Sequence, residues 1–322
     1  MVAAARSPAQ TRQNTPFNGK SSAELTFCKA SPGTIFRMVA LAPTSLPDAL
    51  SALREHPDAH ILAGGTDFMV EVNFGHRRPP SVVSLRNVRE LRARIWNDTT
   101  LLLGANVTYA DLAAPDVAEH FPALSAAART VGSPQIRNAG TIGGNVGTGS
   151  PAGDTLPVLA ALDAVIHLAD VDGSTRSLGW QSFFLAPKRT ARKPTEIITG
   201  VELPLHRTRQ DYLKVGTRNA MVISVAGLAL VIDLDDRAVR VGLGSVGPVP
   251  LRAPEAEKWV VNHLDWSDAS NGNVSVPDPR TYETFGTMVA EASKPINDQR
   301  STAEYRKHAV KVLAQRALMR LV

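Results

Sequence analysis

A glycine-rich segment at residues 138–154 constrains the fold of this chain more than any other feature. Six glycines fall within fourteen residues of it, inside a region that is otherwise able to fold. A disordered linker is the alternative, but Ile142, Val146 and the apolar run after Asp154 argue against it. Because glycine lacks a Cβ, backbone that is rich in it can approach a ligand closely. The segment therefore predicts a binding loop within a folded domain.

A shorter glycine segment lies about eighty residues earlier, at residues 61–68. An apolar stretch leads into Gly64 and Gly65, and Thr66 and Asp67 follow. Glycine permits positive φ, so successive N–H groups can turn inward and form an anion-binding nest. The threonine hydroxyl can add a further donor. Taken alone, the segment also fits a plain turn at the end of a strand.

Residues 147–152 satisfy the G-x-G-x-x-G/A fingerprint of dinucleotide-binding proteins, with Asp170 about twenty residues later. That fingerprint requires a hydrophobic strand before the first glycine and a helix after the turn. Residues 141–145 are not such a strand, and Pro151 disturbs the turn. We therefore do not expect a Rossmann site here.

The composition excludes several classes of function. The single cysteine, Cys28, cannot supply the roughly four protein ligands of an iron–sulfur cluster or a structural zinc ion. It forms no disulfide within the chain, and we expect a cytoplasmic protein. No apolar run approaches the ~18 residues of a membrane helix, so we expect no membrane span. The net charge is +5, but the bases are spread out, so we expect no nucleic-acid partner.

The hydrophobic pattern predicts an α+β chain with two domains, because strands and helices mix without a regular βαβ repeat. Residues 1–34 are polar and are expected to be a disordered leader. Ser301 and Glu304 predict a capping box at the start of the last helix. The other expected elements are helices at 47–53, 123–131 and 156–164, strands at 59–63, 82–85, 101–103, 222–233 and 238–244, and a surface loop at 265–278.

Together and in this order, the two glycine segments resemble the FAD-binding domain of molybdenum hydroxylases of the xanthine dehydrogenase type. Residues 62–67 resemble the first pyrophosphate loop of that family, and residues 135–145 with Ser150 and Asp154 resemble the second. Residues 194–198 resemble the strand that brings an apolar residue against the flavin. The segments at 214–218 and 301–306 resemble the small C-terminal domain of the same flavoproteins.

The resemblance implies a vanillyl-alcohol-oxidase (PCMH)-type FAD-binding domain of two α+β subdomains over residues 35–207. A small α+β domain of the carbon-monoxide-dehydrogenase-flavoprotein type follows over residues 208–322. The cofactor-binding residues that it implies are Ile61, Leu62, Ala63, Gly64, Gly65, Thr66, Asp67, Phe68, Thr141, Ile142, Gly143, Gly144, Asn145, Ser150, Asp154, Ile198 and Lys214.

Individual roles follow from the same resemblance. The N–H groups of residues 63–67 are expected to hold the pyrophosphate, and Ile198 to pack on the isoalloxazine ring. Arg218 is a candidate for docking of the electron acceptor. Alternatives stay open for three of these residues. Asp154 also fits a helix N-cap, and Lys214 and Arg218 also fit ion pairs at the surface or between domains.

The implied function is that of the FAD-binding subunit of a xanthine dehydrogenase-like molybdenum hydroxylase. Such a subunit has no catalytic side chain or metal of its own. It accepts electrons from two [2Fe–2S] clusters, and these clusters and the molybdopterin cofactor belong to partner subunits, in a dimer of heterotrimers. It passes the electrons to NAD or another acceptor. A free-standing flavin-dependent oxidase of the same fold and a carbon-monoxide-dehydrogenase-type medium subunit are the alternatives.

Overall fold

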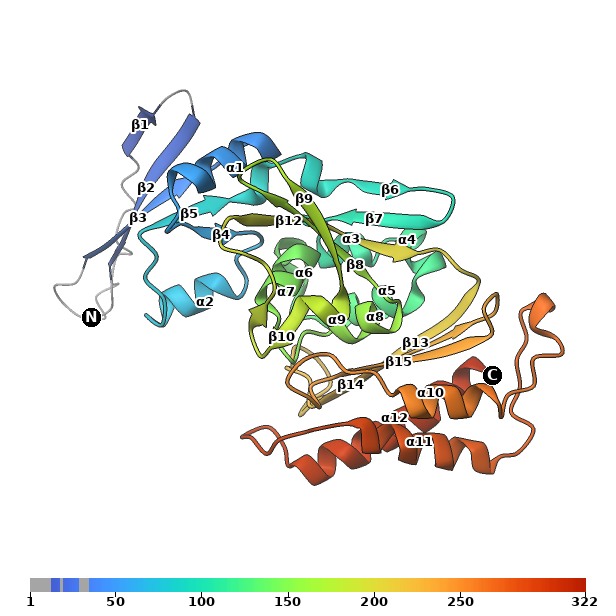
Figure 1. The fold of residues 1–322 in the computed structure, drawn as a ribbon. Coiled ribbons are helices and arrows are strands. Elements are labelled where there is room, and N and C mark those ends of the chain that lie inside the picture. The colour runs from blue at the N-terminus through green and yellow to red at the C-terminus, as the bar shows by residue number, and fades with distance from the viewer. Residues whose placement is uncertain (1–12, 18–19, 29–34) are drawn as a thin grey trace, which may run out of the picture.

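Three β-sheets of three or more strands, with helices between and around them, make up the α+β fold expected from the sequence (Figure 1). The computed structural model describes residues 13–17, 20–28 and 35–322. Within these residues, no helix combines the length and the apolarity that crossing a membrane requires.

The first sheet has the strand order β1-β2-β3-β5-β4. Strands β1 to β3 pair antiparallel, whereas β3, β5 and β4 run parallel to one another. Helices α1 and α2 lie in the connections between the parallel strands, a local βαβ arrangement that the sequence did not lead us to expect. The elements are β1 (Gln13–Phe17), β2 (Lys20–Cys28), β3 (Ile35–Leu41), α1 (Leu46–Glu55), β4 (His60–Leu62), α2 (Phe68–Asn73) and β5 (Ser81–Ser84).

The expectation of a disordered leader is wrong for the described parts of residues 1–34. Strand β2 pairs with β3 from Ser22–Leu41 to Cys28–Ile35, and β1 pairs with β2. The physical reason is that the edge of β3 offers backbone N–H and C=O groups, with which the backbone of β2 pairs. Residues 1–12, 18–19 and 29–34 lie outside the described residues.

The second sheet is fully antiparallel in the order β6-β7-β12-β8-β9. Its strands are β6 (Arg94–Trp96), β7 (Thr100–Gly104), β8 (Val165–Asp170), β9 (Thr175–Gly179) and β12 (Glu196–Pro204). Its helices and the small hairpin are α3 (Tyr109–Leu112), α4 (Pro115–His120), α5 (Pro122–Thr130), α6 (Pro134–Ala139), α7 (Ile142–Thr148), α8 (Leu156–Ala161), α9 (Trp180–Phe183), β10 (Phe184–Ala186) and β11 (Arg189–Thr190).

Strand β12 joins the two subdomains, because side chains alternate across a strand. Ile197 packs with α1 and β5 of the first subdomain, whereas Ile198 packs into the core of the second. A β-bulge between Ile198 and Gly200 interrupts the pairing with β8 at this point. Bulges bend a strand and re-aim its side chains, and this one lies beside the cavity described below.

The third sheet, β13-β14-β15, lies between α8 on one side and α10 and α12 on the other (Figure 1). Leu228 and Leu230 of β14 face a core formed with the last helices, whereas Ala229 and Val231 face the core of the preceding domain. The elements are β13 (Thr208–Val215), β14 (Ala226–Asp233), β15 (Ala238–Gly244), α10 (Pro254–Val261), α11 (Arg280–Ala292) and α12 (Ala303–Leu321).

The third sheet packs closely against the preceding domain. A Cβ on Gly242 of β15 would overlap the carbonyl oxygen of Pro157 in α8. The main-chain N–H of Ser245 donates to the Pro151 carbonyl at 2.8 Å. The C-terminal domain therefore shares part of its packing with the preceding domain, and it contacts the glycine-rich segment directly.

The N-terminus of the last helix differs from the expected capping box by one residue. Helix α12 is capped by Thr302, whose hydroxyl accepts from the N–H of Tyr305. Ser301 is instead held in a tight turn, because its N–H donates to the Asp298 carbonyl at 3.2 Å. The capping prediction on Ser301 is wrong because this turn uses Ser301 before the helix begins.

Candidate cofactor site

A cavity of about 780 Å³ lies between the two glycine segments and reaches the connection between β13 and β14. This volume lies within the roughly 300–1,000 Å³ that is typical of small-molecule sites. Fourteen of the residues expected at a cofactor site line it: Ile61, Ala63, Gly64, Gly65, Thr66, Asp67, Phe68, Thr141, Gly143, Gly144, Asn145, Ser150, Asp154 and Ile198. Leu62, Ile142, Lys214 and Arg218 are not among the lining residues.

The first glycine segment offers the cavity a row of free donors. The chain leaves β4 at Leu62 and turns through Gly65, whose φ of +77° is in the left-handed region that favours glycine. The N–H groups of residues 64–68 donate to no acceptor within the described part of the chain. Helix α2 begins at Phe68, so its positive end lies at the same place. Such a row of N–H groups binds an anion.

In the second glycine segment, several N–H groups donate to acceptors within the protein. Ile142 donates to the Val107 carbonyl and Gly143 to the Ala105 carbonyl, each at 2.9 Å. The Gly144 N–H donates to the Thr141 hydroxyl at 3.0 Å, which caps α7. The side chain of Ile142 is fully buried in the core. Ile142 therefore supports the loop from behind and does not face the cavity.

Asn145 and Ser150 are two of the polar residues of this segment that line the cavity. The Thr155 hydroxyl donates to Asn145 Oδ1 at 2.6 Å, which leaves the amide nitrogen of Asn145 without a partner among the described residues. The Ser150 hydroxyl accepts from the Ala152 N–H at 3.3 Å. Both Asn145 and Ser150 line the cavity, so each can offer a donor to a ligand.

Asp154 is the buried carboxylate of the site, and the third sheet holds it. Lys214 Nζ lies 2.6 Å from Asp154 Oδ2, and the Tyr212 hydroxyl donates to Asp154 Oδ1 at 3.1 Å. Burial raises the pKa of Asp154, while Lys214 and Tyr212 act in the opposite direction. The helix N-cap alternative is not observed, because Thr155 occupies the cap position of α8. Lys214 acts through Asp154, as an ion pair between the two domains.

The apolar wall of the cavity is formed around Ile198. Its side chain is 6% exposed, belongs to the core and also lines the cavity. Gly147 lies opposite, since a Cβ there would stand 3.4 Å from Ile198 Cδ1. Gly147 has no side chain, so the cavity wall beside Ile198 has room for a methyl group at this position.

Arg218 binds its own loop and is not among the residues that line the cavity. Its guanidinium donates to the carbonyl of Ala220 at 3.0 Å and to that of Met221. Met221 has a φ of +49°, an uncommon conformation for a residue with a side chain. This turn brings Met221, Val222 and Ile223 to the cavity wall. The role predicted for Arg218 in acceptor docking stays a prediction.

Sequence reasoning missed a group of charged residues that also line the cavity. Glu71 of α2 pairs with Lys188 at 3.0 Å and with Arg77 at 2.8 Å, and all three line the cavity. Lys188 belongs to the β10–β11 turn, so this clasp joins the two subdomains. The hydrogen bond from Lys188 is the main cause that lowers the pKa of Glu71. Glu71 and Lys188 are 117 residues apart in the sequence, so no local pattern predicts their ion pair.

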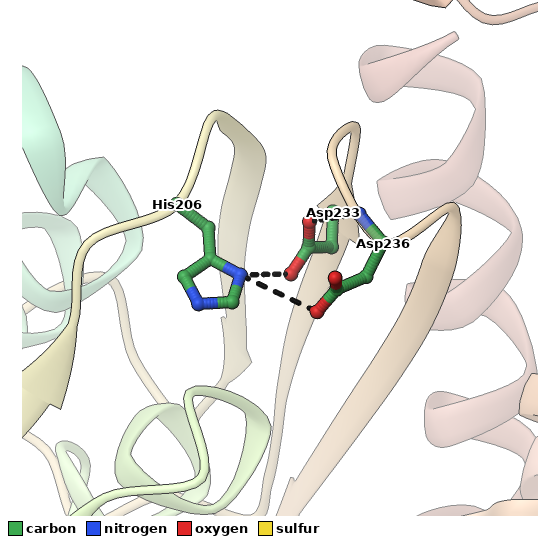
Figure 2. A group of neighbouring side chains, drawn as sticks. All are labelled: His206, Asp233 and Asp236. Carbon is green, nitrogen blue, oxygen red and sulfur yellow. Dashed lines mark hydrogen bonds and ion pairs between the residues drawn. The ribbon is translucent and has the colours of Figure 1, made fainter. Parts of the chain in front are cut away.

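His206, Asp233 and Asp236 form the one candidate set of metal ligands among the described residues (Figure 2). His206 Nδ1 lies 2.7 Å from Asp233 Oδ2 and 3.5 Å from Asp236 Oδ2. Arg240 Nη1 lies 2.9 Å from the same oxygen of Asp233 and already supplies positive charge there. Burial acts to raise the pKa of Asp233, but hydrogen bonds from Asp236, Arg240 and His206 hold it below its ordinary value. None of the three ligand candidates lines the cavity, and they tie the interdomain linker to β14.

Comparison with known proteins agrees with this architecture. The family described as "FAD binding domain in molybdopterin dehydrogenase" matches residues 35–206, and "CO dehydrogenase flavoprotein C-terminal domain" matches residues 211–321. The nicotinate dehydrogenase FAD-subunit of Eubacterium barkeri is 34% identical over 232 residues, which cover 68% of this chain and 78% of the relative. The xanthine dehydrogenase FAD-binding subunit of Escherichia coli O157:H7 is 27% identical, over 86% of this chain and 94% of the relative.

The crystal structure of quinoline 2-oxidoreductase from Pseudomonas putida 86 superposes with a TM-score of 0.78 at 25% identity, over 87% of this chain and 95% of that one. The chain therefore belongs to the family of FAD-binding subunits of molybdopterin dehydrogenases. The cavity fits this cofactor: free N–H donors suit a diphosphate, and a glycine-lined apolar wall suits a flat ring system.

Proposed function

We propose that this chain is the electron-exit subunit of a xanthine dehydrogenase-like molybdenum hydroxylase. The observation that carries the proposal is the cavity between the two glycine segments, with its row of free N–H groups at residues 64–68. Bound FAD supplies the chemistry of taking up single electrons and releasing them in pairs. The chain's own part is to bind and orient the flavin and to exclude water from it.

Individual residues divide this work in the proposal. The N–H groups of residues 64–68 hold the diphosphate of FAD, because they have no other acceptor. Ile198 and the space beside Gly147 receive the isoalloxazine ring. Asp154, held by Lys214 and Tyr212, places a buried polar group near the cofactor. The FAD-binding domain spans residues 35–207, and the small C-terminal domain spans residues 208–322.

The electrons reach this chain from partner subunits in our proposal. A single cysteine cannot ligate a [2Fe–2S] cluster, which takes about four protein ligands. We therefore assign two [2Fe–2S] clusters to a small partner subunit and the molybdopterin cofactor to a large one. We propose a dimer of such heterotrimers in the cytoplasm, with NAD or another carrier as the final acceptor.

A visible spectrum combined with metal analysis tests this function on the protein purified with its native partners. Flavin bands with iron and molybdenum in a fixed ratio support the electron-exit role. Flavin without metals, together with turnover by the isolated chain, would instead establish a free-standing oxidase. A folded chain that carries no flavin would contradict the assignment of the cavity.

A further inference from the structure

Tyr109 is a cavity residue that the sequence did not single out, and the fold holds it rigidly. It is the first residue of α3, whose start is fixed by a reciprocal capping box between Thr108 and Asp111. The Tyr109 N–H donates to the Gly140 carbonyl at 3.1 Å. The ring lies over Gly140, because a Cβ on that glycine would come within 2.7 Å of Tyr109 Cε2. The position of the phenol ring is thus set by the backbone of the second glycine segment.

The hydroxyl of Tyr109 has no hydrogen-bond partner within the described residues. The side chain is 5% exposed, and it lines the cavity. Asp67 of the first glycine segment and Asp154 of the second are the charged groups close enough to act on it. Burial is the main cause that raises the pKa of Tyr109, so the phenol keeps its proton and remains a donor. The phenol is therefore a donor at the cavity wall with no acceptor among the described residues.

We propose that the Tyr109 hydroxyl donates a hydrogen bond to the ribityl–diphosphate chain of bound FAD. This inference rests on the binding of FAD to the cavity. Tyr109 lines the same cavity as Asp67 of the first glycine segment and Asp154 of the second. The ribityl–diphosphate chain carries hydroxyl and phosphate oxygens, which are acceptors for a phenol. The aspartates at either side make no hydrogen bond with Tyr109 within the described structure.

The test is the affinity of the full-length apoprotein for FAD, measured by flavin fluorescence in Tyr109→Phe. This substitution keeps the ring over Gly140 and removes only the oxygen. We expect the dissociation constant to rise by about tenfold to a hundredfold, as for a lost hydrogen bond to a charged or strongly polar group. Tyr305→Phe is the matched control, since Tyr305 is 51% exposed and does not line the cavity.

Two further readouts separate a direct contact from a structural role. The melting temperature of the Tyr109→Phe apoprotein should equal that of the wild type, because the hydroxyl makes no protein contact. The affinity ratio between variant and wild type should stay constant from about pH 6 to 9, because the raised pKa keeps the phenol protonated.

The outcomes distinguish this inference from the proposed function. An unchanged dissociation constant, or a loss of affinity matched by a loss of thermal stability, overturns the role of Tyr109 alone. A folded wild-type apoprotein that takes up no FAD overturns both the cofactor site and the contact. A weaker FAD complex with unchanged apoprotein stability supports the contact.

Discussion

The two glycine segments differ in what their glycines do, although both line the same cavity. In the first, residues 64–68 keep their N–H groups free, and the adjoining helix α2 buries only Val72. In the second, Ile142 and Gly143 donate to the protein, and Asp154 is tied to the C-terminal domain. The first segment offers donors to a ligand from a lightly packed support. The second forms a firm wall with few free backbone groups.

The comparison teaches that a glycine-rich run can serve packing as well as ligand contact. A Cβ on Gly64 would overlap the Ala139 carbonyl, and one on Gly143 would come within 2.7 Å of the Ala105 carbonyl. Both glycines therefore let backbone approach backbone. Gly147 instead leaves open space beside Ile198. Which glycine does which cannot be seen in the sequence, because the approaching atoms come from elsewhere in the chain.

The largest expected effect comes from breaking the anchor of the second segment with Lys214→Met. This variant leaves the buried Asp154 carboxylate without its cation. We therefore expect the free energy of unfolding to fall by about 3–5 kcal/mol near pH 8. Denaturant titrations of the apoprotein at several pH values measure this effect.

The pH dependence has a defined sign. Burial raises the pKa of Asp154 in the folded state above the unfolded value of 3.8, so protons bind more tightly to the folded protein. Lys214 acts to lower this pKa, so its removal should raise the pKa further, and the stability of Lys214→Met should fall relative to wild type as the pH rises above the folded-state pKa of Asp154 in the wild type. The double variant Lys214→Met with Asp154→Asn should lose this pH dependence. A loss of stability that is equal at all pH values would contradict the ion-pair account.

The contact between the two segments can be broken with Gly64→Ala. The new methyl group has no room against the Ala139 carbonyl, so we expect a loss of about 1–3 kcal/mol in stability and loss of bound flavin. Thermal denaturation and flavin content after purification measure the two effects. Gly179→Ala serves as the control, because only the end of the Gln181 side chain lies near that position. Equal behaviour of the two variants would refute close packing at Gly64.

A smaller effect, of opposite sign for stability, is expected from Gly147→Ala in α7. Alanine favours a helix by about 0.5–1 kcal/mol over glycine, and its methyl group meets only Ile198 at 3.4 Å. The apoprotein should become more stable, while the FAD complex weakens by roughly tenfold because the methyl fills the space beside Ile198. Calorimetry and a fluorescence titration test the pair of effects. Tighter FAD binding would show that the flavin does not use this space.

The smallest effect is expected at the support of the first segment, with Lys188→Ala. Its ion pair with Glu71 is partly exposed, so we expect less than about 1 kcal/mol in stability. Release of FAD should become faster at low salt, because α2 carries the first segment and loses its link to the hairpin. High salt should remove this difference by screening. Lys258→Ala, whose partner Glu255 lies on the exposed face of α10, should leave the release rate unchanged.

Much of the fold followed from local patterns. The apolar spacing around Pro47 predicted α1, and the runs at 82–85 and 238–244 predicted β5 and β15 within about one residue. These elements need only their own periodicity and end signals. The predictions failed for β1 and β2, because β2 is ordered by backbone pairing with β3, and β1 by pairing with β2, which no local pattern of the polar leader indicated.

The site could be predicted only in part. The glycine segments were found because their unusual runs of residues mark them in the sequence, whereas Ile198 was suggested only by the family resemblance. Tyr109 and the Glu71–Lys188 clasp were not found, since their partners lie far away along the chain. The guanidinium of Arg218 binds the carbonyls of its own loop, which no pattern in the sequence indicated, and its predicted role in acceptor docking stays a prediction. Isolated residues therefore predicted the site less well than the glycine-rich segments did.

The sequence by itself determined the type of site, because two glycine runs in this order supply backbone that can turn and approach closely. It also determined that this chain cannot supply the cysteine ligands of an iron–sulfur cluster, because it has one cysteine. Only the tertiary structure decided which N–H groups stay free and which support the fold. It also paired Asp154 with Lys214 and turned Tyr109 toward the cavity. The reason is that hydrogen-bond satisfaction and burial depend on residues that the chain brings together only after it has folded.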